Sequence, residues 1–186
     1  MDIVEEAREF VIKEKGKYVN EFLLFEVAEQ KVKELVEKLD ADKTVALIGY
    51  YFMDVKRPEA SSQGKSEEHV RRGVEFVKEF LKKHDLDTET NEKIINCVEA
   101  HHGDVPFICK EAEICANADS YKFLCPRGLL AFVFASGNKD RSFGKTLQMA
   151  DDKLDEKLKM ITLPEVKKEL EPYYHQFKEI IKQAKK

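Results

Sequence analysis

Apolar residues recur at intervals of three and four along almost the whole 186-residue chain, and alternating apolar and polar residues never continue beyond a few positions. The first spacing lines one face of an α-helix, whereas alternation would line one face of a β-strand. We therefore expect an all-α protein, whose length suits one domain with a substantial buried core. That domain should span residues 1–186, with a core at about 20–135 and a C-terminal helical pair at about 138–184.

The limits of the helices follow from residues that interrupt this periodicity. The segment from Asp42 to Val55 is apolar almost all round and should form the central buried helix of a bundle. Residues 56–66 contain Pro, Gly and three Ser, which predicts a loop that ends with Ser66 as an N-cap. Asp87 or Thr88 should cap a later helix. The other expected helices cover residues 2–15, 21–39, 67–84, 88–101, 110–123, 126–134, 140–160 and 164–184.

Charge and cysteine usage limit the classes of function. Lys and Arg (32) nearly balance Asp and Glu (36), so the net charge of -4 argues against a broad nucleic-acid interface, which needs a basic excess. The N-terminal residues lack the long apolar stretch of a signal peptide or membrane span, so we expect a cytoplasmic protein without a membrane partner. The four cysteines form no CxxC pair and should be reduced thiols in or near the core.

Four short segments contain imidazole and carboxylate side chains, which are ligands for divalent transition metals. In chain order these segments are GYYFMDVKRP at 49–58, HVRRGVE at 69–75, CVEAHHG at 97–103 and EAEICANAD at 111–119. Their order and spacing resemble those of the HD-domain metal-dependent phosphohydrolases, in particular the small stand-alone prokaryotic members. The resemblance covers about residues 24–125 and implies an HD-domain helical bundle that hydrolyses phosphate esters with a bound metal.

The resemblance also implies which residues form the site. The implied metal ligands are Asp54, His69, His101, His102 and Asp119, and the two aspartates are the implied catalytic residues. Because a helix turns only one of two adjacent side chains inward, we expect His101 to point into the site rather than His102. Arg57 matches an arginine of the family pattern and, with Arg72, would bind phosphate; a solvated charged loop is the alternative.

The chain departs from the family pattern at two expected ligands. The early histidine of the family falls near Leu24 here, and Met53 stands where the histidine of the His-Asp pair is expected. A thioether is a poor ligand for a borderline divalent ion, so the first metal site should be abolished or much weakened, whereas Asp54, His69 and His101 leave a one-metal site. Alternatively, Met53 and Leu24 belong to a metal-free apolar core.

Two functions therefore remain open. One is a metal-dependent phosphohydrolase that acts on a nucleotide or another small phosphate ester, with Mn, Ni, Fe or Zn as cofactor. The other is a catalytically inactive HD-fold binding or regulatory module, which needs no metal.

The tail from residue 153 to 186 is amphipathic and either closes the bundle or forms a homodimer face. His84 should lie at a helix end and His175 on the surface, both outside the site.

Overall fold

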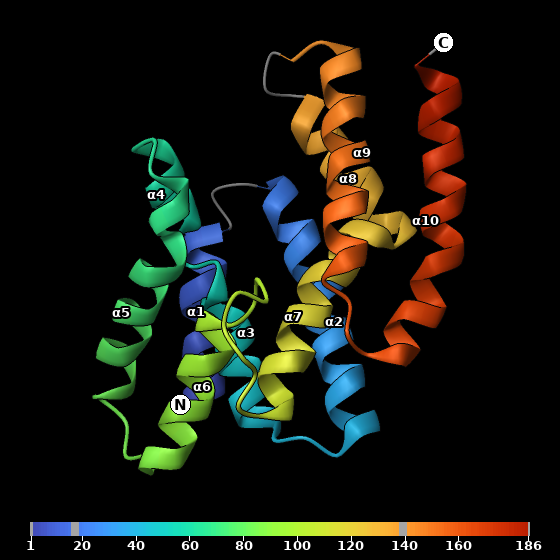
Figure 1. Ribbon diagram of the computed structural model, residues 1–186. Helices are drawn as coiled ribbons and strands as arrows, with labels where there is room; N and C mark the ends of the chain where they lie inside the picture. Colours follow the sequence, from blue (N-terminus) through green and yellow to red (C-terminus); the bar gives the residue numbers. More distant parts are fainter. Residues whose placement is uncertain (1, 16–18, 138–140, 186) are drawn as a thin grey trace. The chain divides into compact units, whose positions relative to one another are not determined.

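The computed structural model describes residues 2–15, 19–137 and 141–185, and these residues form helices and no β-strand (Figure 1). The expected all-α class is confirmed. The helices are α1 (Ile3–Lys15), α2 (Val19–Leu39), α3 (Lys43–Met53), α4 (Arg57–Ser62), the 3-10 turn η1 (Ser66–Glu68), α5 (His69–Leu81), α6 (Thr88–Glu99), α7 (Lys110–Leu124), α8 (Pro126–Gly137), α9 (Phe143–Lys159) and α10 (Pro164–Ala184).

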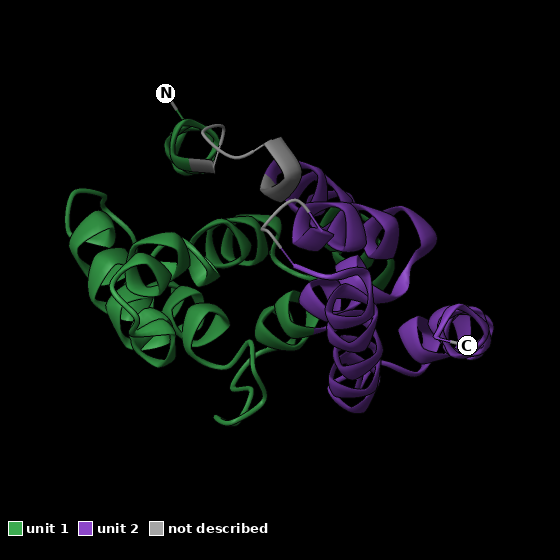
Figure 2. Ribbon diagram, turned by 90° about the horizontal axis from the view of Figure 1, so that it is seen from above, with its two compact units in different colours: residues 1–17, 32–116 green, residues 18–31, 117–186 purple. Residues whose placement is uncertain are grey.

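The chain divides into two compact units (Figure 2). Unit 1 comprises residues 1–17 and 32–116, and unit 2 comprises residues 18–31 and 117–186. Helices α2 and α7 each contribute residues to both units. The single domain expected over residues 1–186 stays a prediction, and residues 138–140, where its C-terminal helical pair should begin, lie outside the described residues.

Helix α3 forms the centre of unit 1, as its continuous apolar sequence predicts. Every residue from Val45 to Met53 is buried, and α3 packs against α1, α5 and α6 (Figure 1). The Asp42 side chain caps the helix by accepting hydrogen bonds from the backbone N–H groups of Thr44 (2.8 Å) and Val45 (3.0 Å). The cap thereby fixes the residue at which α3 begins, and the buried segment ends directly before Asp54.

In unit 2, helix α9 packs against α8 and α10. The side chain of Asn117 on α7 fixes the turn between α9 and α10, because its Oδ1 accepts from the N–H groups of Thr162 and Leu163, each at 3.1 Å. Pro164 then occupies the first turn of α10, where a missing backbone N–H costs no hydrogen bond. The expected break between the last two helices at residues 163–164 is therefore confirmed.

Two local predictions between α3 and α5 are wrong. Residues 57–62 form the short helix α4 rather than a loop, with Pro58 in its first turn, where proline is compatible with a helix. Ser66 does not cap a helix but lies in η1, where its hydroxyl hydrogen-bonds to that of Ser61 (3.0 Å). Helix α5 consequently begins at His69, and no side chain caps it.

Among the described residues, no helix is both long enough and apolar enough to span a bilayer.

Candidate metal centre

The first component of the site is Asp54, which directly follows α3 as its C-terminal cap. Its side chain is buried, with only 5% of the residue exposed. The guanidinium of Arg57, one turn further along, lies 3.5 Å from Asp54 Oδ1 and is itself partly exposed. A buried carboxylate needs compensating positive charge, and Arg57 supplies part of it from the solvent side.

The second component is His69, the first residue of α5. Its Nδ1 lies 2.6 Å from the backbone carbonyl of Ser66, which can only accept a hydrogen bond, so Nδ1 carries the proton. In the neutral ring Nε2 then has the free lone pair, and this atom lies 3.7 Å from Asp54 Oδ1. The η1 turn, which supplies the Ser66 carbonyl, therefore orients His69 as a metal ligand.

His101 follows the end of α6 and is completely buried. Its Nδ1 lies 2.7 Å from the Val98 carbonyl, which again requires a proton on Nδ1 and leaves the lone pair on Nε2. Nε2 lies 3.8 Å from Asp54 Oδ1. A hydrogen bond from the second ring nitrogen to a backbone carbonyl is common for metal-binding histidines, because it fixes the tautomer and the ring orientation.

His102 also points into the site, and our expectation that only His101 would do so is wrong. Its Nε2 lies 3.0 Å from His69 Nε2. Helix α6 ends at Glu99, so the two histidines lie in the following turn, where adjacent side chains need not diverge as they do on a helix. Three imidazoles from two separate segments of unit 1 therefore lie together, and two of them, His69 and His101, lie within 3.8 Å of Asp54 Oδ1.

The distances in this cluster suit a single divalent metal ion. The ligand atoms of His69, His101 and His102 all lie within 4.8 Å of one another. Bonds of about 2.1 Å place the ligand atoms of a tetrahedral site about 3.4 Å apart, so side-chain shifts of about 1 Å would bring the three nitrogens into one coordination sphere. Three imidazole nitrogens with one carboxylate form a donor set that suits zinc, iron, manganese or nickel.

The two positions where family ligands are expected but missing contribute no metal-binding atom suited to these ions. Met53 precedes Asp54 and is 1% exposed, which makes it one of the most deeply buried side chains of unit 1. Leu24 belongs to unit 2 and is half-buried. Both side chains are apolar, and the burial of Met53 agrees with the alternative that this position belongs to the apolar core.

The predicted phosphate-binding arginines differ in their surroundings. Arg57 is partly exposed beside Asp54, as described above. Arg72 instead donates to Glu68 through Nε (2.9 Å) and Nη2 (2.6 Å), and to Gln63 through Nη1 (2.8 Å). A phosphate would have to compete with the Glu68 carboxylate for this guanidinium, so the role of Arg72 in phosphate binding stays a prediction without further support.

Asp119 belongs to unit 2, and its carboxylate is almost completely buried. One oxygen lies 2.6 Å from the Lys157 ammonium and the other 2.5 Å from that of Lys122. Both lysines are themselves buried, and the sequence spacing indicates only the pair with Lys122, three positions along α7, and not the pair with Lys157. The role of Asp119 as a metal ligand and catalytic residue stays a prediction. A metal ion would have to compete with the two ammonium groups for this carboxylate.

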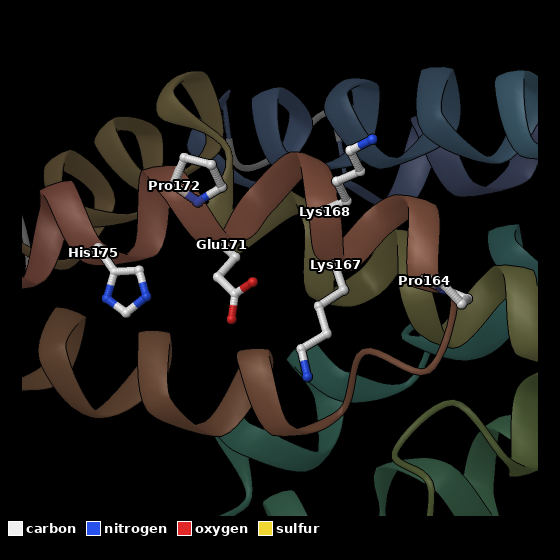
Figure 3. Close-up of a pocket in the computed structure, with 6 residues that line it drawn as sticks. All are labelled: Pro164, Lys167, Lys168, Glu171, Pro172 and His175. Atoms are coloured by element: carbon white, nitrogen blue, oxygen red, sulfur yellow. The ribbon is translucent and has the colours of Figure 1, made fainter.

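The remaining histidines lie outside the cluster. His84 follows the end of α5, with its Nε2 3.7 Å from Glu6, and His175 is exposed, as expected for both. A hollow on α10 is shown in Figure 3, where Lys167, Glu171 and His175 extend from the same side of the helix. Its mixed charges include one histidine and one carboxylate, which is a poorer donor set for a metal than that of the cluster in unit 1.

Comparison with known proteins identifies the family. The family model of the HD domain matches residues 25–124, which is more than half of the chain and includes all four segments with potential ligands. No curated protein shows significant similarity to the chain, and no solved structure does. The helical fold and the extent of this match together establish that the chain belongs to the HD domain family.

Proposed function

We propose that this protein binds one divalent transition metal ion through Asp54, His69, His101 and His102, and that with this ion it hydrolyses a small phosphate ester. The observation that carries the proposal is the cluster of three imidazoles, two of which lie within 3.8 Å of a buried carboxylate. The Nδ1 hydrogen bonds of His69 and His101 support it further, since they turn both Nε2 lone pairs toward Asp54 without any metal.

A bound divalent ion would supply polarisation of the phosphoryl oxygen and a lowered pKa for a nearby water. The chain's own residues complete this chemistry. Asp54 provides a negative charge that would attract the cation and could accept a proton from the attacking water. Arg57, which is partly exposed beside Asp54, could hold the phosphate oxygens from the solvent side.

The contact between His69 and His102 indicates how the site responds to metal. Two Nε2 atoms at 3.0 Å must share a proton, and since His69 carries its own on Nδ1, His102 donates from Nε2. Metal binding would require that proton to leave Nε2, for example by a change of His102 to the Nδ1–H tautomer, after which both Nε2 lone pairs face the cation.

A second function is favoured by a specific observation. Met53 is buried where the family histidine is expected, so this chain retains fewer ligands than the family pattern provides. A protein with the HD fold that binds its ligand without hydrolysing it is consistent with that loss, because a fold does not determine an activity.

The metal content of the purified protein tests the proposal. Protein prepared without a histidine tag or chelator should contain about one equivalent of transition metal per chain, and His69→Ala and His102→Ala should each lose most of it, since each removes one of four ligands. His175→Ala is the matched control, because this exposed histidine on α10 lies outside the cluster.

The outcome distinguishes the two functions. Bound metal together with phosphate release from a panel of nucleotides and sugar phosphates would support the phosphohydrolase. Bound metal without any turnover would favour the binding module. If the wild-type protein retains no Mn, Ni, Fe or Zn after loading, or if all three variants retain it equally, the metal site itself is refuted.

A further inference from the structure

Three of the four cysteines are gathered in unit 1. Cys97 lies on α6, Cys109 directly precedes α7, and Cys115 lies on α7; within unit 1 all three thiols are reduced. Cys115 is buried, and its thiol donates to the backbone carbonyl of Ala46 at 3.3 Å. The Cys97 thiol interacts with the thiols of both Cys109 and Cys115, and Cys97 is the main thiol partner of Cys109.

Two hydrogen bonds of a neighbouring side chain hold the segments of Cys97 and Cys109 together. Asn96 Nδ2 donates to the carbonyl of Pro106 (3.0 Å), and Asn96 Oδ1 accepts from the N–H of Ile108 (3.0 Å). Asn96 and Ile108 are the chain neighbours of the two cysteines. The Sγ of Cys109 also lies 4.0 Å from the carbonyl of Lys93, one helical turn before Cys97. Both observations place Cys109 directly beside the part of α6 that contains Cys97.

The two thiols differ in exposure and in acidity. Cys97 is completely buried and packs against Gly49, whereas Cys109 is partly exposed. Burial raises the pKa of the Cys97 thiol well above its usual range. The adjacent Cys97 thiol lowers the pKa of Cys109, and the backbone N–H of Ala112 in the first turn of α7 lowers it further. Since the thiolate is the reactive form, Cys109 should be the more reactive of the two.

We propose that Cys109 and Cys97 form a reversible redox pair, in which Cys109 is the site of oxidation by a hydroperoxide and Cys97 is the resolving thiol. In the first step the Cys109 thiolate attacks the peroxide, so that an S–O bond forms, the O–O bond breaks and the leaving oxygen takes up a proton. The product is a sulfenic acid at Cys109. In the second step the Cys97 sulfur displaces the hydroxyl group, which leaves as water with the Cys97 proton, and a disulfide forms.

The disulfide would close a covalent loop over residues 98–108, which contains both His101 and His102. The Asn96 hydrogen bonds already hold this loop in a closed arrangement, so the bond could form with little movement of the backbone. The proposal does not depend on metal binding, because the thiol chemistry involves none of the ligands of the metal centre.

Hydrogen peroxide and peptide mapping under non-reducing conditions provide the test. In the wild-type protein, a Cys97–Cys109 linked peptide should appear and disappear again on reduction. Cys97→Ala should stop at a sulfenic acid on Cys109, which dimedone traps, and Cys109→Ala should show neither product. Cys115→Ala and Cys125→Ala are the matched controls, because each removes a buried thiol and should leave the linked peptide unchanged.

Thiol labelling of the untreated protein provides a second measurement that needs no variant of buried Cys97. Iodoacetamide should modify Cys109 about tenfold or more faster than any other cysteine, since buried thiols are inert. Labelling of Cys109 at the rate of the buried cysteines would overturn the proposal. So would a disulfide that joins a different pair of cysteines, or a linked peptide that persists in Cys109→Ala.

Discussion

Gly49 shows how a single residue sets the spacing of two helices in unit 1. It lies in the middle of α3, where glycine is ordinarily less favourable than alanine. A Cβ atom at this position would lie 2.2 Å from the Cβ of Cys97 on α6, well below any real contact distance. The absence of a side chain therefore allows α3 and α6 to approach closely, and the segments that follow both helices supply Asp54, His101 and His102.

Gly49→Ala should destabilise the protein by about 1–3 kcal/mol, because the extra methyl group overpacks the contact between the two helices. Urea denaturation followed by circular dichroism measures the change. Gly144→Ala is the matched control: Gly144 lies in α9 with open space around it, so alanine should leave the stability equal or slightly higher. Equal stability of Gly49→Ala and the wild-type protein would contradict this account of the close approach.

The start of α6 shows how a helix is held in place by its cap. The Asp87 carboxylate accepts from the backbone N–H of Thr90 (2.8 Å) and from its hydroxyl (2.7 Å). These hydrogen bonds lower the pKa of Asp87 below its usual 3.8, and the bond from the Thr90 hydroxyl contributes most. A group whose pKa is lower in the folded state stabilises the fold above its unfolded pKa and loses this contribution as the pH falls through the folded value.

Asp87→Ala should therefore lower the thermal midpoint at neutral pH, where the cap is charged. Circular dichroism at a pH well below 3.8 should show a smaller difference between the variant and the wild-type protein, because protonation has by then weakened the cap of the wild type. Asp85→Ala, which removes an exposed carboxylate two positions earlier, is the control and should change neither midpoint. A difference that stays constant over this pH range would count against the cap.

On the scale of the whole molecule, the two units contain buried charge of different kinds. In unit 1 two imidazoles lie within 3.8 Å of the buried carboxylate of Asp54, and imidazole is a ligand suited to a metal. In unit 2 the buried carboxylate of Asp119 is paired with the ammonium groups of Lys157 and Lys122. The second arrangement neutralises its own charge, since each oxygen of Asp119 has a cationic partner.

Asp119→Asn should destabilise the protein by about 3–5 kcal/mol, because it removes the buried carboxylate that pairs with both ammonium groups, and Glu156, 3.6 Å from Lys157, is partly exposed. Thermal or urea unfolding measures this loss. The double variant Asp119→Asn with Lys157→Met should recover part of the stability, since it also removes one of the two buried ammonium groups. A single variant as stable as the wild-type protein would contradict the triad. Metal analysis of the folded single variant also tests the predicted ligand role of Asp119, which requires that the bound metal is lost.

The amino-acid sequence alone determined the helical class, the central buried helix and the family, because all three depend on patterns that are local in the chain. Apolar spacing specifies a helix whatever its neighbours are, and the four motif segments are recognisable without coordinates. Asp54, His69 and His101 could be named as candidates for the same reason. The short helix α4 was missed because its Pro and Ser residues are as typical of a helix start as of a loop.

Only the tertiary structure decided which candidate atoms meet. His102 joins the metal centre because α6 ends at Glu99, two residues before the expected end at residue 101. A change of one residue at a helix end redirects the next side chain by about 100°. The backbone carbonyls that orient His69 and His101 have no counterpart in the side-chain sequence at all. The partners of Asp119 lie 3 and 38 positions away, and no spacing rule connects the more distant one. The sequence specifies which chemical groups a side chain has, but the direction of its lone pairs depends on packing over the whole unit.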